Sequence, residues 1–267
     1  MTLDQVLPLQ LLPAAALQSV RGVLTDIDDT LTQAGAIEPA ALVALQQLAV
    51  AQVPVIAITG RPAGWSEPFA MAWPVAAIVA ENGAVMLRRD GDALWRDFAQ
   101  DKATRAAHFQ RLQRCAQAVL AAVPGARLAR DSAGRLTDIA IDHGEFAHLD
   151  TGQIDAVGAV MRSHGLNVSV SSIHINGWIG AHHKASGARW AVETVLGVPF
   201  DPAEWLFVGD STNDQSMFEQ VRLSVGVANL LHFADRLHTW PKYLATAERG
   251  AGFAQVAQAL LAARAGA

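Results

Sequence analysis

The sequence predicts an α/β protein whose core is a doubly wound, Rossmann-like parallel sheet, with a second, α+β domain inserted into that core. Three observations predict this class. Short apolar runs alternate with helical stretches toward both ends of the chain. These runs are apolar on both faces, as strands covered by helices on two sides must be. The middle of the chain is more polar, and its apolar residues alternate with polar ones.

The first part of the core is predicted from three apolar runs. Strands are expected over residues 23–25, 53–59 and 75–79. A long uncharged stretch, residues 39–60, divides into a helix over 39–51 and the second of these strands. Glutamines and a proline interrupt this stretch, which argues against a membrane span.

The inserted domain is predicted over residues 87–178, which leaves 1–86 and 179–267 for the core. Helices near 103–123 and 151–163 accompany alternating strands over 136–141 and 168–171. Alternation predicts a sheet with one wet face. Glycines within 81–84 and 177–180 lie near the two crossings and suit a hinge.

The second part of the core returns to strand and helix alternation. Strands are expected over 205–208 and 224–227, and helices over 184–196, 213–220 and 254–263. Gly197 follows the first of these helices, as a helix-ending glycine does. Four tryptophans are expected in the core: Trp65, Trp73, Trp190 and Trp205.

Composition restricts the function classes. The chain has 267 residues, of which 51% are hydrophobic and 17% charged, and its formal net charge is −5. That balance offers no general attraction to phosphate backbones, so we expect no nucleic-acid partner. A single cysteine, Cys115, excludes an intrachain disulfide and a CxxC motif, and we interpret it as a small apolar filler. No Lys or Arg precedes the apolar residues 6–16, so we expect a cytoplasmic protein without membrane contact.

The first acidic cluster follows the strand over 23–25. Asp26 and Asp28 are two residues apart in an extended segment, so their side chains can converge on one point. Such a pair alone is unspecific, and Asp90 and Asp92 form another around a turn glycine, where a solvated hairpin turn explains them. Carboxylates crowded at a buried strand end repel unless a cation joins them or one stays protonated.

Two further groups follow predicted strands or open a helix. Thr59, Gly60 and Arg61 end the strand over 53–59, where a hydroxyl and a flexible backbone can wrap a phosphate oxygen. Lys184 opens a helix after His182 and His183. Zinc is disfavoured there, because adjacent histidines point in different directions and no third His or Cys has familiar spacing.

A second acidic cluster, 209–214, follows the strand over 205–208. A helix N-cap explains Ser211 or Asn213, but it does not explain Asp210 directly after the buried run. Four carboxylates would then meet at one sheet edge: Asp26, Asp28, Asp210 and Asp214. This oxygen-only pocket suits Mg²⁺. A magnesium site beside donors for an anion indicates phosphoryl transfer.

The four motifs, in their order along the chain, resemble those of the haloacid dehalogenase-like (HAD) phosphatases. They are Asp26-x-Asp28-x-Thr30-Leu31, Thr59-Gly60-Arg61, Lys184 and Gly209-Asp210-x-x-Asn213-Asp214. Residues 81–84 and the large insertion resemble subfamily IIB, with its Cof-like, sucrose-phosphatase-like and mannosyl-3-phosphoglycerate phosphatase-like members. Residues 227–229 and 250–253 look closest to the sucrose-phosphatase-like branch. Asp29 departs from the pattern, since many relatives have glycine there.

The resemblance implies a role for each motif residue. Asp26 would be the nucleophile that forms an aspartyl-phosphate, and Asp28 the general acid and base. Mg²⁺ would be held by the carboxylates of Asp26 and Asp210 and the backbone carbonyl of Asp28, with Asp214 orienting it. The phosphate-binding residues implied are Thr59, Gly60, Arg61, Lys184 and Asn213.

The inserted domain would be a lid, or cap, that selects the leaving group. On the strand returning to the core, His174, Asn176 and Trp178 are candidate specificity residues, although alternation alone does not say which strand face meets the core.

The function expected is a Mg²⁺-dependent phosphatase for a small phosphorylated metabolite, with a sugar phosphate as the expected class. The protein would be a monomer or small homo-oligomer. A phosphomutase of the same superfamily is one alternative. A non-catalytic phosphate-binding or regulatory module is another, but binding alone has no need of both Asp26 and Asp28. No GxxxxGK[ST] motif exists, which argues against a P-loop enzyme.

Overall fold

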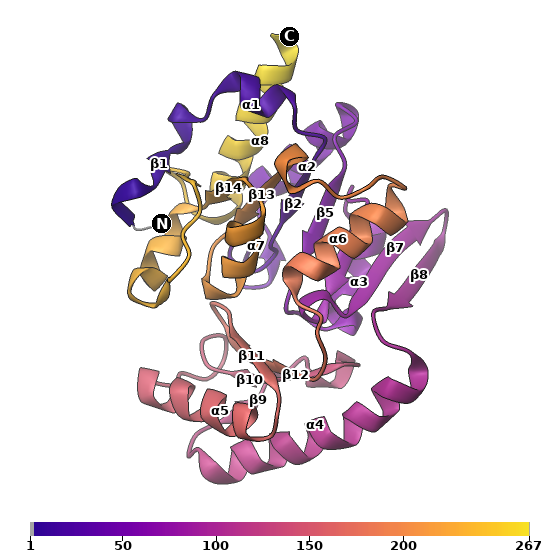
Figure 1. The fold of residues 1–267 in the computed structure, drawn as a ribbon, viewed down its shortest axis with the longest axis vertical. Helices are drawn as coiled ribbons and strands as arrows, with labels where there is room; N and C mark the ends of the chain where they lie inside the picture. The colour runs from indigo at the N-terminus through magenta and orange to yellow at the C-terminus, as the bar shows by residue number, and fades with distance from the viewer. Residues whose placement is uncertain (1–2, 267) are drawn as a thin grey trace.

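The computed structural model describes residues 3–266, and a large sheet organises most of them (Figure 1). Its strand order among these residues is β1-β15-β14-β13-β2-β5-β6-β7-β8. Neighbours are parallel from β1 through β6, and β7 and β8 continue the sheet as antiparallel strands. The strands span Leu7–Pro8 (β1), Gly22–Thr25 (β2), Val55–Ile58 (β5), Ala77–Ala80 (β6), Val85–Asp90 (β7), Ala93–Phe98 (β8), Trp205–Gly209 (β13), Leu223–Gly226 (β14) and Tyr243–Leu244 (β15). The predicted fold class, an α/β sheet with helices on both sides, is confirmed.

Helices cover both faces of this sheet. The helices of the core span Ala14–Gln18 (α1), Pro39–Val50 (α2), Ala63–Ala72 (α3), Lys184–Val195 (α6), Gln215–Gln220 (α7) and Arg249–Ala265 (α8). In α2 the buried residues Ala41, Ala44, Leu45 and Leu48 recur with helical spacing and form one apolar stripe. Residues of α1, α2, α3 and α8 belong to one apolar cluster, and residues of α6 and α7 to another. Each layer of helices therefore buries a separate apolar face of the sheet.

The predicted core tryptophans lie in these two clusters. Trp73 and Trp205 are buried, at 5% and 1% exposure. Trp65 and Trp190 are partly buried and pack against the clusters.

A second, smaller sheet has the antiparallel order β11-β12-β10-β9. It consists of Arg127–Leu128 (β9), Asp138–Asp142 (β10), Asn167–Val170 (β11) and His174–Trp178 (β12), with helices Lys102–Ala122 (α4) and Thr151–Ser163 (α5) packed on it. The carboxylate of Asp101 accepts hydrogen bonds from the first backbone N–H groups of α4, and Asp150 forms a capping box on α5. Cys115 lies fully buried in the apolar cluster between these elements.

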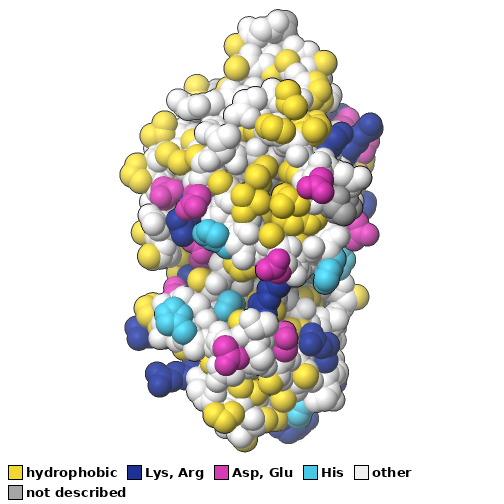
Figure 2. Space-filling model, turned by 90° about the vertical axis from the view of Figure 1, so that its left-hand side faces the viewer, with side chains coloured by type: hydrophobic (Ala, Val, Ile, Leu, Met, Phe, Trp, Pro, Cys, Tyr) yellow, Lys and Arg dark blue, Asp and Glu magenta, His cyan; other side chains and the backbone are white. Residues whose placement is uncertain are grey.

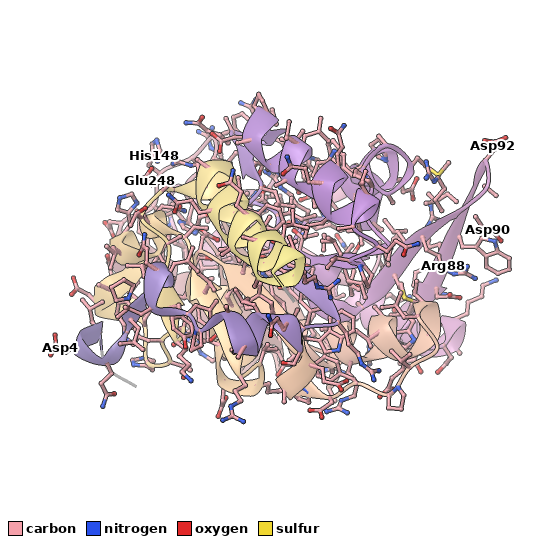
Figure 3. The ribbon with its side chains drawn as sticks, turned by 90° about the horizontal axis from the view of Figure 1, so that it is seen from above. Asp4, Arg88, Asp90, Asp92, His148 and Glu248 are labelled. Carbon is pink, nitrogen blue, oxygen red and sulfur yellow. The ribbon has the colours of Figure 1, made fainter. Side chains whose placement is uncertain are left out.

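The start of the insertion differs from the prediction. Residues 87–98 belong to β7 and β8 of the large sheet, so the chain leaves that sheet after Phe98 and not at Leu87. The polar residues lie in β8, which forms the outer edge of the sheet, and in the second half of β7, whereas Val85, Met86 and Leu87 of β7 are buried. Asp90 and Asp92 flank the predicted hairpin turn at its outer tip (Figure 3).

The expected wet face of the smaller sheet is confirmed only for β11, whose residues are exposed or partly exposed and whose Ser169 lines a cleft. Every residue of β10 and β12 is buried. One face of the sheet packs on α4 and α5, and polar residues of the other contact the end of β5, as described below. In β10 and β12 the polar half of the alternating pattern therefore faces a buried interface and not water.

The two parts of the molecule meet at a waist. On the face shown in Figure 2, charged and histidine side chains gather around this level. No helix within residues 3–266 is long and apolar enough to cross a membrane.

Candidate active site

Three carboxylates meet where two neighbouring strands of the large sheet end. Strands β2 and β13 are parallel and pair Thr25 with Val208, so their carboxyl ends coincide. Asp26 follows β2, and Asp210 and Asp214 lie in the turn after β13. Oxygen atoms of these three carboxylates lie within 4.8 Å of one another, and all three residues are buried.

The ammonium group of Lys184 joins this cluster from the first turn of α6. Its Nζ lies 2.5 Å from Asp26 Oδ1 and 2.8 Å from Asp214 Oδ1. Burial raises the pKa of Asp26 to about 7, although Lys184 opposes that rise. Burial and the neighbouring carboxylates of Asp26 and Asp214 also raise the pKa of Asp210. One ammonium therefore compensates three carboxylates only in part.

The excess of negative charge in this cluster bears on whether its residues could hold a metal ion. Buried carboxylates are stable as anions only when cations or hydrogen-bond donors compensate them. The available ligands are all hard oxygen atoms, which suit Mg²⁺ better than Zn²⁺. A divalent cation beside Asp26 and Asp210 would supply the missing positive charge, so the residues present fit the metal.

Asp214 shapes the turn that carries Asp210. Its Oδ2 accepts hydrogen bonds from the backbone N–H of Asp210 at 2.9 Å and of Ser211 at 3.2 Å. A Cβ at Gly209 would lie only 2.4 Å from that oxygen, so glycine is required there. Asn213 accepts a hydrogen bond from Ser211 Oγ, at 3.0 Å, and among residues 3–266 the hydrogen bonds of the Lys184 ammonium go to Asp26 and Asp214.

Asn229 is a site residue that the sequence reasoning missed. Its Nδ2 donates to Asp210 Oδ2 at 3.2 Å and to the backbone carbonyl of Asp29 at 2.9 Å, so it ties the turns after β2 and β13 together. Asp29 itself pairs with Arg249 at 3.0 Å. The sequence held a signal for Asn229, because it follows the strand β14 that neighbours β13 in the parallel sheet.

The carboxylate of Asp28 points away from this acidic cluster and toward Arg61. Both Asp28 oxygens lie 3.0 Å from Arg61 Nε. Burial raises the pKa of Asp28, and the Arg61 guanidinium only partly opposes that rise. Asp28 could contribute to a metal site at Asp26 only through its backbone, and its raised pKa suits a carboxyl group that carries a proton.

Arg61 was expected to bind phosphate, and the structure gives its side chain other partners. The guanidinium also contacts two carboxylates of the insertion, Asp131 at 3.2 Å and Glu145 at 2.8 Å, and lies over the Trp65 ring. Three carboxylates occupy its donors, which leaves none directed at a phosphate. Arg61 therefore links Asp28 to the inserted part.

The other two members of this motif, Thr59 and Gly60, lie at the end of β5. Thr59 is fully buried at the end of β5, and its Oγ1 accepts a hydrogen bond from the Arg61 N–H at 3.0 Å. The Gly60 carbonyl accepts from Arg135 Nη1 at 3.0 Å and from Asn176 Nδ2 at 3.1 Å. Two residues of the insertion thus hydrogen-bond to the turn at Gly60.

The three candidate specificity residues divide between two places. His174 Nε2 lies 3.3 Å from Glu145, and Asn176 bonds Asp138 as well as Gly60, so both belong to the interface with the core. Trp178 lines a cleft, and its Nε1 donates to the His182 carbonyl at 2.8 Å.

The histidines before Lys184 have structural roles. His183 accepts a hydrogen bond from Ser186 N at 3.3 Å and so caps α6. Burial lowers the pKa of His182 to about 4, which keeps its ring neutral.

Residues 81–83, expected as part of a hinge, form a tight anchor. Glu81 is fully buried and accepts hydrogen bonds from backbone N–H groups of Ala63, Leu136 and Thr137 at 2.6–3.0 Å. The Glu81 carboxylate therefore links the start of the core helix α3 to the residues directly before β10 of the insertion.

A cleft of about 760 Å³ opens beside the acidic cluster, between the two parts of the molecule. Its lining includes Lys184 at the site, Asn82 and Asn213 from the core, and Arg162 and Trp178 from the insertion. The arrangement offers a buried carboxylate at Asp26, a second carboxyl group held apart from it, a fixed ammonium and an adjoining space for a polar molecule.

Comparison with known proteins identifies the fold. The sequence model of the haloacid dehalogenase-like hydrolases matches residues 23–122. No curated protein matches the chain in sequence.

Solved structures match nearly the whole chain. A protein from Thermoplasma acidophilum has a TM-score of 0.67 at 17% identity, covering 91% of this chain and 98% of its own. The sucrose-phosphatase from Synechocystis sp. PCC6803, solved with sucrose and phosphate, has a TM-score of 0.64 at 17% identity, covering 90% and 98%. A phosphatase of the HAD superfamily from Bacteroides thetaiotaomicron has a TM-score of 0.62 at 17% identity, covering 95% and 98%. At these identities the likeness establishes the fold.

Proposed function

We propose that the chain, which matches the sequence model of the haloacid dehalogenase-like hydrolases over residues 23–122 and shares the fold of a solved phosphatase of the HAD superfamily, is a Mg²⁺-dependent phosphatase. It would hydrolyse a small phosphorylated metabolite through an aspartyl-phosphate. The observation that carries the proposal is the buried pair of Asp26 and Lys184, with Asp28 held separately by Arg61. Together they would supply a nucleophile paired with a cation and a separate carboxyl group of raised pKa on one short segment.

The two carboxyl groups have different tasks in this reaction. Asp26 attacks phosphorus and forms the acyl-phosphate bond, while the bond from phosphorus to the leaving oxygen breaks. Asp28 gives its proton to that leaving oxygen and then takes one from the water that hydrolyses the acyl phosphate. The raised pKa of Asp28 suits the first of these steps. Lys184 favours the ionised form of Asp26 against the effect of burial and holds its carboxylate in place.

The metal would be held by the carboxylates of Asp26 and Asp210 and by the Asp28 backbone carbonyl. When bound, it supplies positive charge for the phosphoryl oxygens. Asp214 holds the Asp210 turn through two backbone N–H groups, and Asn229 fixes the Asp210 carboxylate from the opposite side. Thr59, Gly60 and Lys184 border the same space and would hold phosphate oxygens.

A sugar phosphate is the substrate class that the cleft favours. Hydroxyl and amide side chains line it, among them Ser169, Thr212 and Asn213, and the Trp178 ring offers a flat apolar face. Hydroxyl-rich ligands bind through such donors and acceptors. The similarity in fold to a sucrose-phosphatase supports the same class. The insertion would act as a cap over the leaving group.

A screen of phosphorylated metabolites with Mg²⁺ tests the proposal, with p-nitrophenyl phosphate as the generic substrate. We expect Asp26→Asn to lower turnover by at least about 10³-fold, because the nucleophile is lost. Asp92→Asn, at the tip of the β7–β8 hairpin, is the matched control and keeps wild-type turnover. Unchanged hydrolysis by Asp26→Asn would remove Asp26 as the nucleophile. An isomerised sugar phosphate without free phosphate would make the protein a phosphomutase.

A further inference from the structure

Asn82 has an unusual place and backbone conformation. It lies in the tight turn between β6 and β7, with φ of +56° and ψ of +30°. Its backbone N–H donates to the Thr59 carbonyl at 3.0 Å. The following residue, Gly83, packs so closely on α6 that a Cβ there would lie 2.4 Å from the His183 carbonyl oxygen. Asn82 is therefore held between the turn at Thr59 and the start of α6 that carries Lys184.

The side-chain amide of Asn82 is buried and unpaired. The residue is only 2% exposed, and its Nδ2 has no hydrogen-bond partner among residues 3–266. Buried donors without partners are rare in native proteins and cost stability. The amide lines the cleft together with Lys184 and lies beside Gly60, since a Cβ at Gly60 would be 3.3 Å from Asn82 Oδ1 and 3.5 Å from Nδ2.

The backbone alone does not explain this amide. A left-handed residue is accommodated best by glycine, and asparagine is tolerated. Glycine would give the same turn without burying an unsatisfied donor. The cost of the amide is therefore offset by a partner that enters the cleft.

We propose that Asn82 is a phosphate-binding residue whose Nδ2 donates a hydrogen bond to a phosphoryl oxygen of the substrate. This inference rests on the proposed function, and it adds a neutral donor between Gly60 and Lys184. An anionic oxygen in that space meets the ammonium of Lys184 on one side and the amide of Asn82 on the other. A neutral amide gains a strong hydrogen bond there without adding charge beside Asp26.

The test compares Asn82→Gly and Asn82→Asp with the wild type in the presence of Mg²⁺. Binding of orthophosphate is measured by calorimetry, turnover of p-nitrophenyl phosphate by kinetics, and stability by thermal unfolding. Asn82→Gly keeps the left-handed turn and should bind orthophosphate roughly 10- to 100-fold more weakly, as loss of a hydrogen bond to a charged acceptor predicts. Asn82→Asp should bind it more weakly still, because a carboxylate repels phosphate.

Gln52→Gly is the matched control, because Gln52 is an exposed left-handed residue, at φ of +57°, away from the cleft. It should leave both orthophosphate binding and turnover unchanged. Orthophosphate binding by Asn82→Gly equal to that of the wild type overturns the inference, whatever its turnover. Equal loss in Asn82→Gly and Asn82→Asp, with a lowered melting temperature, also overturns it, because the role would then be structural.

The proposed function can fail separately. If the wild type hydrolyses no phosphate ester but binds orthophosphate, and Asn82→Gly weakens that binding, the inference stands and the proposed function falls. If the wild type neither hydrolyses phosphate esters nor binds orthophosphate, both are overturned.

Discussion

Replacing Arg61 with methionine should both lower the stability of the protein and change the pH dependence of its activity. The Arg61 guanidinium is buried at 3% exposure and contacts Asp28, Asp131 and Glu145 at 2.8–3.2 Å. Methionine has a similar length but leaves three carboxylates without their cation. Arg61→Lys keeps the charge, but one ammonium cannot reach three carboxylates in the geometry of the guanidinium fork.

The magnitude follows from the burial of the partners. Breaking a buried ion pair by removing one partner costs about 3–5 kcal/mol. Glu145 and Asp131 are partly exposed and can be rehydrated when the interface opens, so we expect the lower end, about 3 kcal/mol. For a protein of this size, that corresponds to a fall in melting temperature of roughly 6–12 °C.

The pH profile of kcat/KM gives an independent readout. Asp28 must be protonated to act as the acid, so activity falls as pH rises through its pKa. Arg61 lowers that pKa against the effect of burial. Its removal should therefore move the alkaline limb of the profile to higher pH, with a lower maximum because Asp28 is less well positioned.

The control is Arg189→Met, since Arg189 is half exposed, lies over the Phe200 ring and, within residues 3–266, forms an ion pair only with Glu193, at 3.8 Å. We expect a change within about 0.5 kcal/mol for this surface substitution. The reasoning is refuted if Arg61→Met melts like Arg189→Met and its alkaline limb stays where the wild type has it.

Three further predictions concern the acidic cluster. Magnesium should bind more tightly at pH 8 than at pH 6 and release protons, because burial raises the pKa of Asp26 to about 7 and that of Asp210 above its usual value. Calorimetry in buffers of different ionisation enthalpy measures the number of protons released. A Mg²⁺ affinity that does not change with pH would contradict the prediction. A folded-state pKa above the unfolded value means stability that is lost as pH rises through about 7, so the chelator-treated protein should melt lower at pH 8 than at pH 6. Asn229→Ala should weaken Mg²⁺ binding by about 10- to 100-fold, since Asp210 loses a positioning partner, and affinity equal to the wild type would show that Asn229 has no such role.

Much of the site was predictable because its residues follow strand ends. Asp26 and Asp210 lie directly after apolar runs that become parallel neighbours, and position in such a sheet is enough to bring them together. Lys184 required the family resemblance, because nothing in its local sequence distinguishes it from a surface lysine.

The role of Arg61 could not be read from its motif. Its partners Asp131 and Glu145 lie 70 and 84 residues further along the chain, in a part whose docking the sequence does not reveal. The proposed role of Asn82 could not be predicted from the sequence either. An asparagine beside a glycine indicates a turn, but it does not reveal that the side-chain amide lacks a hydrogen-bond partner. Residues 87–98 of the hairpin were placed in the insertion because edge strands share their polar composition.

The place of β13 in the sheet has a consequence for biosynthesis. Strand β2, made early, pairs on one side with β5 and on the other with β13, whose residues are translated about 180 positions later. Until then, the fully buried strand Gly22–Thr25 presents an open, apolar edge of the kind that pairs with other chains. A nascent or prematurely ended chain that lacks residues 205–209 would expose that edge and form aggregates. That edge of β2 can be covered only after residues 205–209, in the last quarter of the chain, have been translated.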